Sequence, residues 1–290
     1  MTFGQPRFAA VNAVLNQRVD LVGTLIVVHR GTAVGSIVEN TPEAVLAAVA
    51  SGGDVVEIDV VASTDGELFA FHDGTEPRLL GITANLRTLT ARQIRDQRYV
   101  HVERPGRPAR VAGLLDLLAA VPGGTLVNVD RSWDAWRTLL PALDTLDMTG
   151  RLLLKCRAGD EAADVLRAHP VKYPFMPICT TVAQAHQHLD DPDLNTVGVE
   201  LIAGDATSPF LDADVVAGLH ARGAFVMVNA EVLATGLDLF AGHDDERAVL
   251  DSPEAGWGPL FALGVDMIQT DWPWLLRDYR AARQRVPVGT

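Results

Sequence analysis

The sequence predicts an α/β fold, a TIM-type (β/α)8 barrel with a small insertion after the second strand. Short β-branched runs recur along the 290 residues and alternate with amphipathic stretches rich in Ala and Leu. Most of these runs are continuously apolar, which is typical of parallel strands covered by helices on both faces. Eight strand–helix units in roughly 260 residues match the size of one such barrel. An open, doubly wound sheet is the alternative arrangement of the same units.

The expected strands follow one another at fairly regular intervals. They are residues 24–29, 54–60, 125–130, 151–155, 175–179, 196–201, 224–228 and 267–270. Helices are expected between them at residues 41–51, 133–146, 160–168, 212–222 and 259–263. Pro42 lies in the first turn of the first of these helices, where a missing N–H costs nothing.

Three segments stand outside this alternation. Residues 1–22 form an N-terminal extension before the first strand. Residues 68–71 are a short extended piece that is expected to form a hairpin with residues 61–64 around the turn pair Asp65-Gly66. Residues 74–113, with several Arg, Pro and Gly residues, form the small insertion. We expect no linker, so that residues 1–290 make a single domain.

The composition disfavours several classes of partner. The formal charge of −13 argues against a nucleic-acid surface, which needs clustered Lys and Arg, and against binding to anionic lipid. An anionic substrate would need a locally positive pocket or a bound cation. No apolar run approaches the roughly 20 residues that span a bilayer. Residues 1–16 lack the pattern of a secretory signal, so a cytoplasmic location is expected. Cys156 and Cys179 lie in apolar stretches and are interpreted as buried free thiols.

Three carboxylates at the ends of expected strands form a candidate metal site. Glu57 and Asp59 lie two residues apart on one strand, so both point to the same face, the barrel interior. With Asp130 from the neighbouring strand, they could hold a hard divalent cation. A ligand set of oxygens alone suits Mg2+ or Ca2+ rather than Zn2+. The alternative is an ion-pair network at the rim with Arg30, Lys155 or Arg131.

Two histidines provide a candidate acid–base pair. His29 ends the first expected strand, directly before Arg30, and His72 closes the extended piece after the second strand. In the cleavage of a phosphodiester, one imidazole takes a proton from the attacking oxygen and the other gives one to the leaving alkoxide. Arg30 and a cation would neutralise the phosphate. A lone histidine at a strand end is usually structural, but two of them around an acidic strand favour catalysis.

Further polar residues stand at the ends of later strands. Lys155 ends the fourth strand, Asn229 follows the seventh, and Trp272 comes directly after Asp271 at the end of the eighth. Lys155, Asn229 and Trp272 are predicted to bind substrate, as is Arg30. Lys155 could instead pair with Glu200, which lies in the sixth strand.

A series of short motifs occurs in a fixed order along the chain. The motifs are His29-Arg30-Gly31, Glu39-Asn40-Thr41, Glu57-Ile58-Asp59-Val60, Thr64-Asp65-Gly66, His72-Asp73 and the closing run from Gly264 to Pro273. This series resembles the signature of the glycerophosphodiester phosphodiesterase family. The resemblance extends over residues 26–273 and is dense at both ends.

The resemblance implies a TIM barrel that binds one divalent cation, Mg2+ or Ca2+. It implies that His29 and His72 are the acid–base pair, that Arg30 contacts phosphate, and that Glu57 and Asp59 are metal ligands. The implied reaction is the hydrolysis of a small glycerophosphodiester to an alcohol and glycerol 3-phosphate, a step of lipid metabolism.

The chain departs from the family pattern at several positions. Asp130 stands where the family usually has a ligating Glu. Ser132 stands where a Lys normally contacts phosphate, and Lys155 on the next strand could supply that charge. The usual Trp is absent from residues 226–229, and residues 76–81 replace a common L-x-R-T-T run. Because the last two changes lie where the alcohol would bind, one alternative is a phosphodiesterase or cyclising lyase for a sugar (opine-type) or other bulky diester. Ser132 and the missing Trp keep a second alternative open, a non-catalytic phosphodiester-binding barrel.

Overall fold

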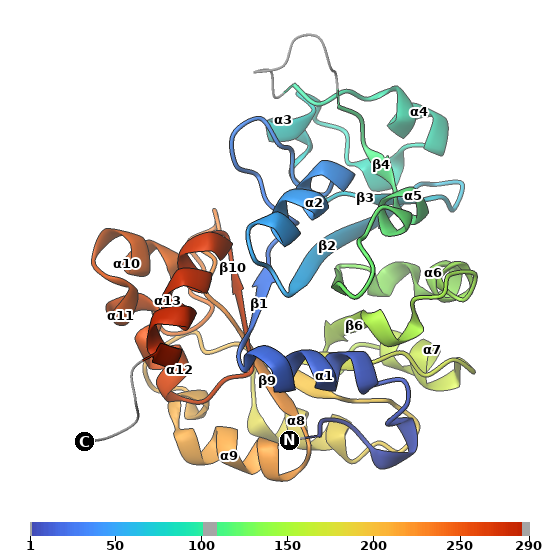
Figure 1. Cartoon of the computed structure of the whole chain (residues 1–290). Coiled ribbons are helices and arrows are strands. Elements are labelled where there is room, and N and C mark those ends of the chain that lie inside the picture. Colours follow the sequence, from blue (N-terminus) through green and yellow to red (C-terminus); the bar gives the residue numbers. More distant parts are fainter. Residues whose placement is uncertain (1, 101–108, 286–290) are drawn as a thin grey trace.

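Eight parallel strands close into a barrel in the computed structural model, which describes residues 2–100 and 109–285 (Figure 1). β1 pairs in parallel with β10 on one side and with β2 on the other, which closes the ring. The predicted barrel is confirmed, and the open doubly wound sheet is wrong because such a sheet would leave two edges. The barrel strands are β1 (Leu25–Val28), β2 (Val55–Ala62), β5 (Leu126–Asp130), β6 (Leu152–Arg157), β7 (Phe175–Cys179), β8 (Gly198–Leu201), β9 (Phe225–Asn229) and β10 (Met267–Thr270).

Helices surround the barrel and lie mostly between successive strands (Figure 1). Thr41 caps the first helix after β1 by accepting a hydrogen bond from the backbone N–H of Ala44, and Pro42 lies in its first turn, as predicted. The helices are α1 (Ala13–Val22), α2 (Pro42–Ala50), α3 (Glu76–Leu79), α4 (Ala91–Asp96), α5 (Leu114–Ala119), α6 (Trp136–Leu143), α7 (Ala162–Ala168), α8 (Val182–Leu189), α9 (Ala213–Ala221), α10 (Asp245–Leu250), α11 (Pro253–Gly256), α12 (Gly258–Ala262) and α13 (Pro273–Arg285).

The lower end of the barrel, where the amino ends of the strands lie, is filled and covered by apolar side chains. Alternate residues of the strands point inward there, among them Leu25, Val55 and Met227. The upper end is the one at which the carboxyl ends of the strands lie. Phe3 and Leu15 from the predicted N-terminal extension pack against this inner layer. The larger core lies between the outer faces of the strands and the helices and includes buried Trp136. Since the lower end is closed, the polar side chains of the barrel gather at the carboxyl ends of the strands.

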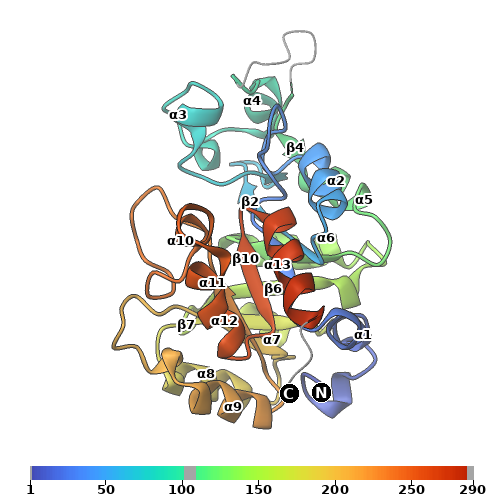
Figure 2. The same ribbon diagram turned by 60° about the vertical axis from the view of Figure 1, so that its left-hand side comes forward.

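The segment after β2 forms the predicted insertion beside the upper end of the barrel. β2 runs on to Ala62 and pairs antiparallel with β3 (Leu68–Ala70), which confirms the hairpin around Asp65-Gly66. β3 in turn pairs with β4 (Ala112–Gly113), and the helices α3 and α4 come between these two short strands along the chain. The insertion has a small hydrophobic core, separate from that of the barrel, which includes Phe69 and Ile94. Both views place α3 and α4 at the end of the molecule opposite α1 and α9 (Figures 1 and 2).

Two expectations about chain composition can be compared with this fold. Cys156 and Cys179 are buried and free, as predicted. Within residues 2–100 and 109–285, no helix has the length and apolar character needed to cross a membrane.

Candidate active site

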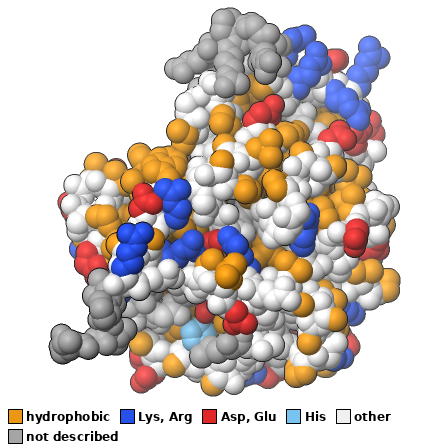
Figure 3. All heavy atoms as spheres, viewed as in Figure 1, with side chains coloured by type: hydrophobic (Ala, Val, Ile, Leu, Met, Phe, Trp, Pro, Cys, Tyr) orange, Lys and Arg blue, Asp and Glu red, His pale blue; other side chains and the backbone are white. Residues whose placement is uncertain are grey.

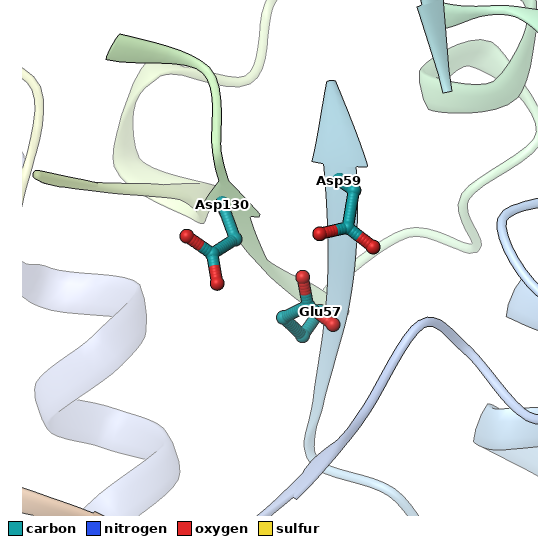
Figure 4. A group of neighbouring side chains, drawn as sticks. All are labelled: Glu57, Asp59 and Asp130. Carbon is teal, nitrogen blue, oxygen red and sulfur yellow. The ribbon is translucent and has the colours of Figure 1, made fainter. Parts of the chain in front are cut away.

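Three carboxylates converge inside the upper end of the barrel (Figure 4). Glu57 and Asp59 project from β2 and Asp130 ends β5, and one oxygen from each lies within 4.8 Å of the others. The parallel pairing of β2 with β5 sets Asp59 directly beside Asp130. The structure therefore brings the three predicted metal ligands together, as the spacing and the strand order suggested.

The charge of this acidic cluster is only partly compensated by the protein. Glu57 is 1% exposed, and its Oε2 accepts a 2.6 Å hydrogen bond from the Arg30 backbone N–H. Its Oε1 has no hydrogen-bond partner among the residues that the structure describes. Burial raises the pKa of Glu57 well above its usual value, and repulsion from Asp59 adds to this against the opposing charge of His29. A buried set of oxygens with an unsatisfied acceptor fits a hard divalent cation.

Asn40, in the loop after β1, orients one of the three carboxylates. Its Nδ2 donates to Asp59 Oδ2 at 2.9 Å, and its Oδ1 accepts from the Asp59 backbone N–H at the same distance. Asn40 has a left-handed backbone with φ of 57°, which Asn tolerates better than most residues. The Glu39-Asn40-Thr41 motif thus holds Asp59 in place and also caps α2.

Arg30 reaches the same cluster from the end of β1. Its Nη1 donates to Glu39 Oε1 at 2.7 Å, and its Nε lies 3.4 Å from Asp59 Oδ2. Arg78, from α3 of the insertion, donates to both oxygens of Glu39 at 2.9 Å. The insertion therefore helps to fix the guanidinium of Arg30 beside the acidic cluster, where it could meet a phosphate.

The two candidate catalytic histidines have different neighbours. His29 Nδ1 lies 3.0 Å from Asp271 Oδ1. Burial alone would lower the pKa of His29, but the hydrogen bond to Asp271 and the charge of Glu231 outweigh it and raise the pKa to about 10. His72 Nδ1 lies 2.8 Å from the backbone oxygen of Asp73. Burial lowers the pKa of His72, and the charge of Arg30 adds to this against the opposing charge of Asp59. One imidazole therefore favours the charged form and the other the neutral form.

Asp245 fixes the backbone at Asp271, and sequence analysis did not identify it as a site residue. Its Oδ2 accepts from the backbone N–H of Asp271, and its Oδ1 accepts from Thr270 Oγ1 and Trp257 Nε1, each at 2.8 Å. Asp245 opens α10, a helix of six residues that gave no periodic signal. It connects α10, the start of α12 and the end of β10, and through Asp271 it positions His29.

Asp245→Ala should lower the free energy of unfolding by at least about 3 kcal/mol, because a buried donor without an acceptor costs about 1–3 kcal/mol and three donors lose theirs. Urea unfolding monitored by circular dichroism measures this. The adjacent exposed Glu246→Ala is the control and should stay within about 0.5 kcal/mol of wild type. An equal loss in both variants would contradict this account of Asp245.

Lys155 lies on β6, beside the acidic cluster, and pairs with two carboxylates. Its Nζ is 2.9 Å from Asp130 Oδ2 and 2.8 Å from Glu200 Oε2. Glu200 Oε1 also accepts from Asn229 Nδ2 at 2.7 Å. The alternative in which Lys155 pairs with Glu200 is thus confirmed, and the substrate-binding roles of Lys155 and Asn229 stay predictions.

Ser132, which stands where a Lys of the family normally contacts phosphate, is fully buried, and Trp136 Nε1 donates to its hydroxyl at 3.0 Å.

Lys155→Met should destabilise the fold by about 3–5 kcal/mol, because it removes the ammonium group that pairs with buried Glu200 and partly buried Asp130. Chemical denaturation at neutral pH measures the loss. Lys172→Met is the matched control, since the Lys172 side chain is partly exposed and donates to a neutral backbone oxygen, that of Arg167. This substitution should cost less than about 1 kcal/mol. A Lys155→Met protein as stable as wild type would show that Asp130 and Glu200 do not need the ammonium group of Lys155.

Two further buried residues at the strand ends, Glu231 and Gln269, were not predicted as site residues. Glu231, two residues after Asn229, accepts from Gln269 Nε2 at 2.9 Å, and its other oxygen has no hydrogen-bond partner within the described part of the chain. The i, i+2 spacing from Asn229 is the only sequence signal that could have indicated Glu231.

Trp272, which was predicted to bind substrate, is 37% exposed at the rim, with its ring centroid 5.5 Å from that of Trp274.

Known proteins share both the sequence pattern and the fold of this barrel. The model of the glycerophosphoryl diester phosphodiesterase family matches residues 29–231, more than half of the chain. The chain belongs to this family. A search of curated protein sequences finds no match. Since members of the family are phosphodiesterases, the protein is an enzyme of that class, and the non-catalytic binding barrel is set aside.

Solved structures with the same fold include several members of this family. A glycerophosphoryl diester phosphodiesterase from Parabacteroides distasonis superposes with a TM-score of 0.65 at 19% identity, covering 92% of this chain and 88% of its own. A glycerophosphodiester phosphodiesterase from Thermotoga maritima gives 0.63 at 16%, with 88% and 98% covered. A phosphodiesterase from Oleispira antarctica, in complex with its product sn-glycerol-3-phosphate, gives 0.65 at 17%, with 90% and 98% covered.

Proposed function

We propose that this phosphodiesterase hydrolyses glycerophosphodiesters to an alcohol and glycerol 3-phosphate with the help of a divalent cation. The observation that carries the proposal is the convergence of Glu57, Asp59 and Asp130 at the barrel end that also holds His29 and His72. The complex of the Oleispira antarctica enzyme with glycerol 3-phosphate supports this choice of product.

Glu57, Asp59 and Asp130 would hold the cation, Mg2+ or Ca2+, because hard cations prefer oxygen ligands. When bound, such a cation supplies positive charge that neutralises the phosphate and the charge that develops on it. Arg30 adds a fixed cation on the same side, since Glu39, which Arg78 holds in turn, accepts from its guanidinium. Lys155 pairs with Asp130 from the neighbouring strand and keeps its carboxylate in position.

His29 is proposed as the acid and His72 as the base. The Asp271 carboxylate behind Nδ1 of His29 stabilises the imidazolium, so that Nε2 can give a proton to the departing alkoxide. Burial and the nearby arginines lower the pKa of His72 and favour a neutral ring, although the hydrogen bond to the backbone oxygen of Asp73 opposes them. That oxygen lies behind Nδ1 and fixes a proton there, so that Nε2 can take a proton from the attacking oxygen. The attacking oxygen is either water or a hydroxyl of the substrate, and the latter gives a cyclic phosphate first.

The test is turnover of a small panel of diesters, with 31P NMR identifying the products. The panel contains glycerophosphocholine, glycerophosphoethanolamine and an opine-type sugar diester, each with EDTA, Mg2+ or Ca2+. Cation-dependent release of glycerol 3-phosphate supports the proposal. Cleavage of the sugar diester alone, or a product that stays cyclic, would favour the alternative enzymes. The cytoplasmic location and the role in lipid metabolism stay predictions.

A further inference from the structure

Glu231 lies in the same inward-facing layer of the barrel as His29 and Asp271. On the neighbouring strands β1, β10 and β9, these three come two positions after residues that pair in register along one row, Val27, Gln269 and Asn229. Residues two apart share a face of a strand, and the apolar residues that precede them on this face fill the barrel interior. The hydrogen bonds from Gln269 to Glu231 and between Asp271 and His29 agree with this arrangement. Asp271 therefore has His29 on one side and Glu231 on the other.

The carboxylate of Glu231 is buried and incompletely satisfied. Glu231 is 5% exposed, and one of its oxygens accepts from Gln269, whereas Oε2 has no hydrogen-bond partner among the described residues. It also forms no ion pair with a Lys or Arg in the described part of the chain. The amide of Asn229, two residues earlier, donates to Glu200 instead. A buried carboxylate in this state is costly unless a positive charge lies near it.

The pocket next to Glu231 does not supply this positive charge. Its volume is about 200 Å3, and its walls come mainly from the loop of residues 230–244 between β9 and α10. Its described lining residues include no Lys, Arg or His, and the two other charged ones are Asp238 and Asp244. Figure 3 shows apolar side chains grouped on the shoulder between the α10–α13 side of the barrel and the part that carries α2 and α3, whereas Lys and Arg lie on the insertion and along α13.

The imidazolium of His29 is the positive charge that acts on Glu231. Burial raises the pKa of Glu231, and the charge of His29 opposes this more than any other group does. In the other direction, burial lowers the pKa of His29, while the hydrogen bond to Asp271 and then the charge of Glu231 raise it. The charges of Asp271 and of Glu57, from β2, follow with smaller effects. The Asp271 side chain is 49% exposed, so that solvent screens its charge, whereas the charge of buried Glu231 is screened less.

We propose that Glu231 is a positioning residue for His29, which it keeps in the imidazolium form while Asp271 fixes the orientation of the ring. Asp271 bonds Nδ1, so that Nε2 faces the substrate, and Glu231 contributes its charge from inside the barrel. The Nε2–H bond then breaks as the O–H bond of the leaving alcohol forms, and the neutral ring recovers a proton from solvent. The proposal rests on the proposed function, since it takes His29 as the acid.

The first test is the pH profile of kcat/KM for glycerophosphocholine. An acid must carry its proton, so activity is present below the pKa of His29 and is lost as the pH rises through it. Glu231→Gln removes the charge but keeps an acceptor for Gln269 Nε2. We expect it to move the alkaline limb down by at least about one pH unit, the smaller end of the effect of a neighbouring opposite charge. A cation bound by the acidic cluster would be common to wild type and variant, and no carboxylate of that cluster bonds His29 among the described contacts.

Three controls separate this role from a structural one. Glu231→Asp keeps the charge and should keep the alkaline limb near that of wild type. Asp238→Asn removes an equal charge from the wall of the same pocket, keeps an acceptor for the Phe240 N–H, and should leave the limb unchanged. With the glycerol phosphodiester of p-nitrophenol, which leaves without a proton, Glu231→Gln should follow the wild-type profile. An unshifted limb in Glu231→Gln, or the same shift with the p-nitrophenyl ester or in Asp238→Asn, would overturn the proposal.

NMR of the His29 ring nitrogens, with Mg2+ present, tests the role of Glu231 without turnover. The signals are assigned by their absence from His29→Ala. The pH at which the ring loses its proton should fall by at least about one unit in Glu231→Gln and stay unchanged in Asp238→Asn. If no diester is turned over but this shift is found, the proposed reaction fails and the pairing of Glu231 with His29 stands. If diesters are hydrolysed and neither the NMR titration nor the alkaline limb shifts, the reaction stands and the role of Glu231 fails.

Discussion

His29→Ala is expected to lower kcat on diesters with aliphatic leaving alcohols by about 10²- to 10⁴-fold, the usual contribution of a general acid. An alkoxide of high pKa needs a proton as it leaves, and the imidazolium held by Asp271 is placed to give it. The same variant should lose far less activity on the glycerol phosphodiester of p-nitrophenol, because p-nitrophenolate leaves without protonation. Steady-state kinetics with both substrates measures the difference.

His72→Ala provides the comparison, because a base is needed whatever group leaves. This variant should lose activity on both substrates to a similar extent, and circular dichroism should show that both variants stay folded. If His72→Ala instead spares the p-nitrophenyl ester while His29→Ala does not, the two roles are reversed. Full activity in either variant on both substrates would exclude the proposed acid–base pair.

The sequence predicted the barrel well because its signals are local. Each strand is a short apolar run, and the structure moves most boundaries by only one or two residues; β1, expected at residues 24–29, is Leu25–Val28. The candidate site was predictable for the same reason. Glu57 and Asp59 share a strand, and the order of β/α units sets Asp130 on the neighbouring strand.

The parts of the site that the sequence did not reveal depend on contacts between distant segments. Asp245 is 26 residues from the backbone N–H of Asp271 that it accepts, and it lies among α10, α11 and α12, which have six, four and five residues. Helices this short do not complete two turns, so they show no hydrophobic period. Glu231 likewise depends on a distant contact, because its hydrogen-bond donor is Gln269 on β10, 38 residues further along the chain. The predicted helix at residues 133–146 is shorter for a local reason, since a 3-10 turn precedes α6 (Trp136–Leu143).

Metal-ligand variants should separate the stability of the cation-free protein from its affinity for the cation. Glu57→Gln keeps an acceptor for the Arg30 N–H but removes a buried charge that is repelled by Asp59 and Asp130. In EDTA the variant should therefore be at least as stable as wild type. Wild type should gain about 2.7 kcal/mol when Mg2+ or Ca2+ is present at 100 times its Kd, a rise in Tm of roughly 5 °C.

Glu57→Gln should lose most of this cation-induced rise in Tm, together with cation-dependent turnover, because one of three ligand carboxylates is gone. Differential scanning calorimetry with EDTA, Mg2+ or Ca2+ measures the shift. Glu246→Gln is the matched control, since it removes an equal charge outside the cluster and should keep the full rise. If Glu57→Gln keeps it as well, or if neither cation shifts the wild-type Tm, the acidic cluster does not hold the metal. In that case the carboxylates act through their pairing with Arg30 and Lys155, the ion-pair arrangement that the sequence left open.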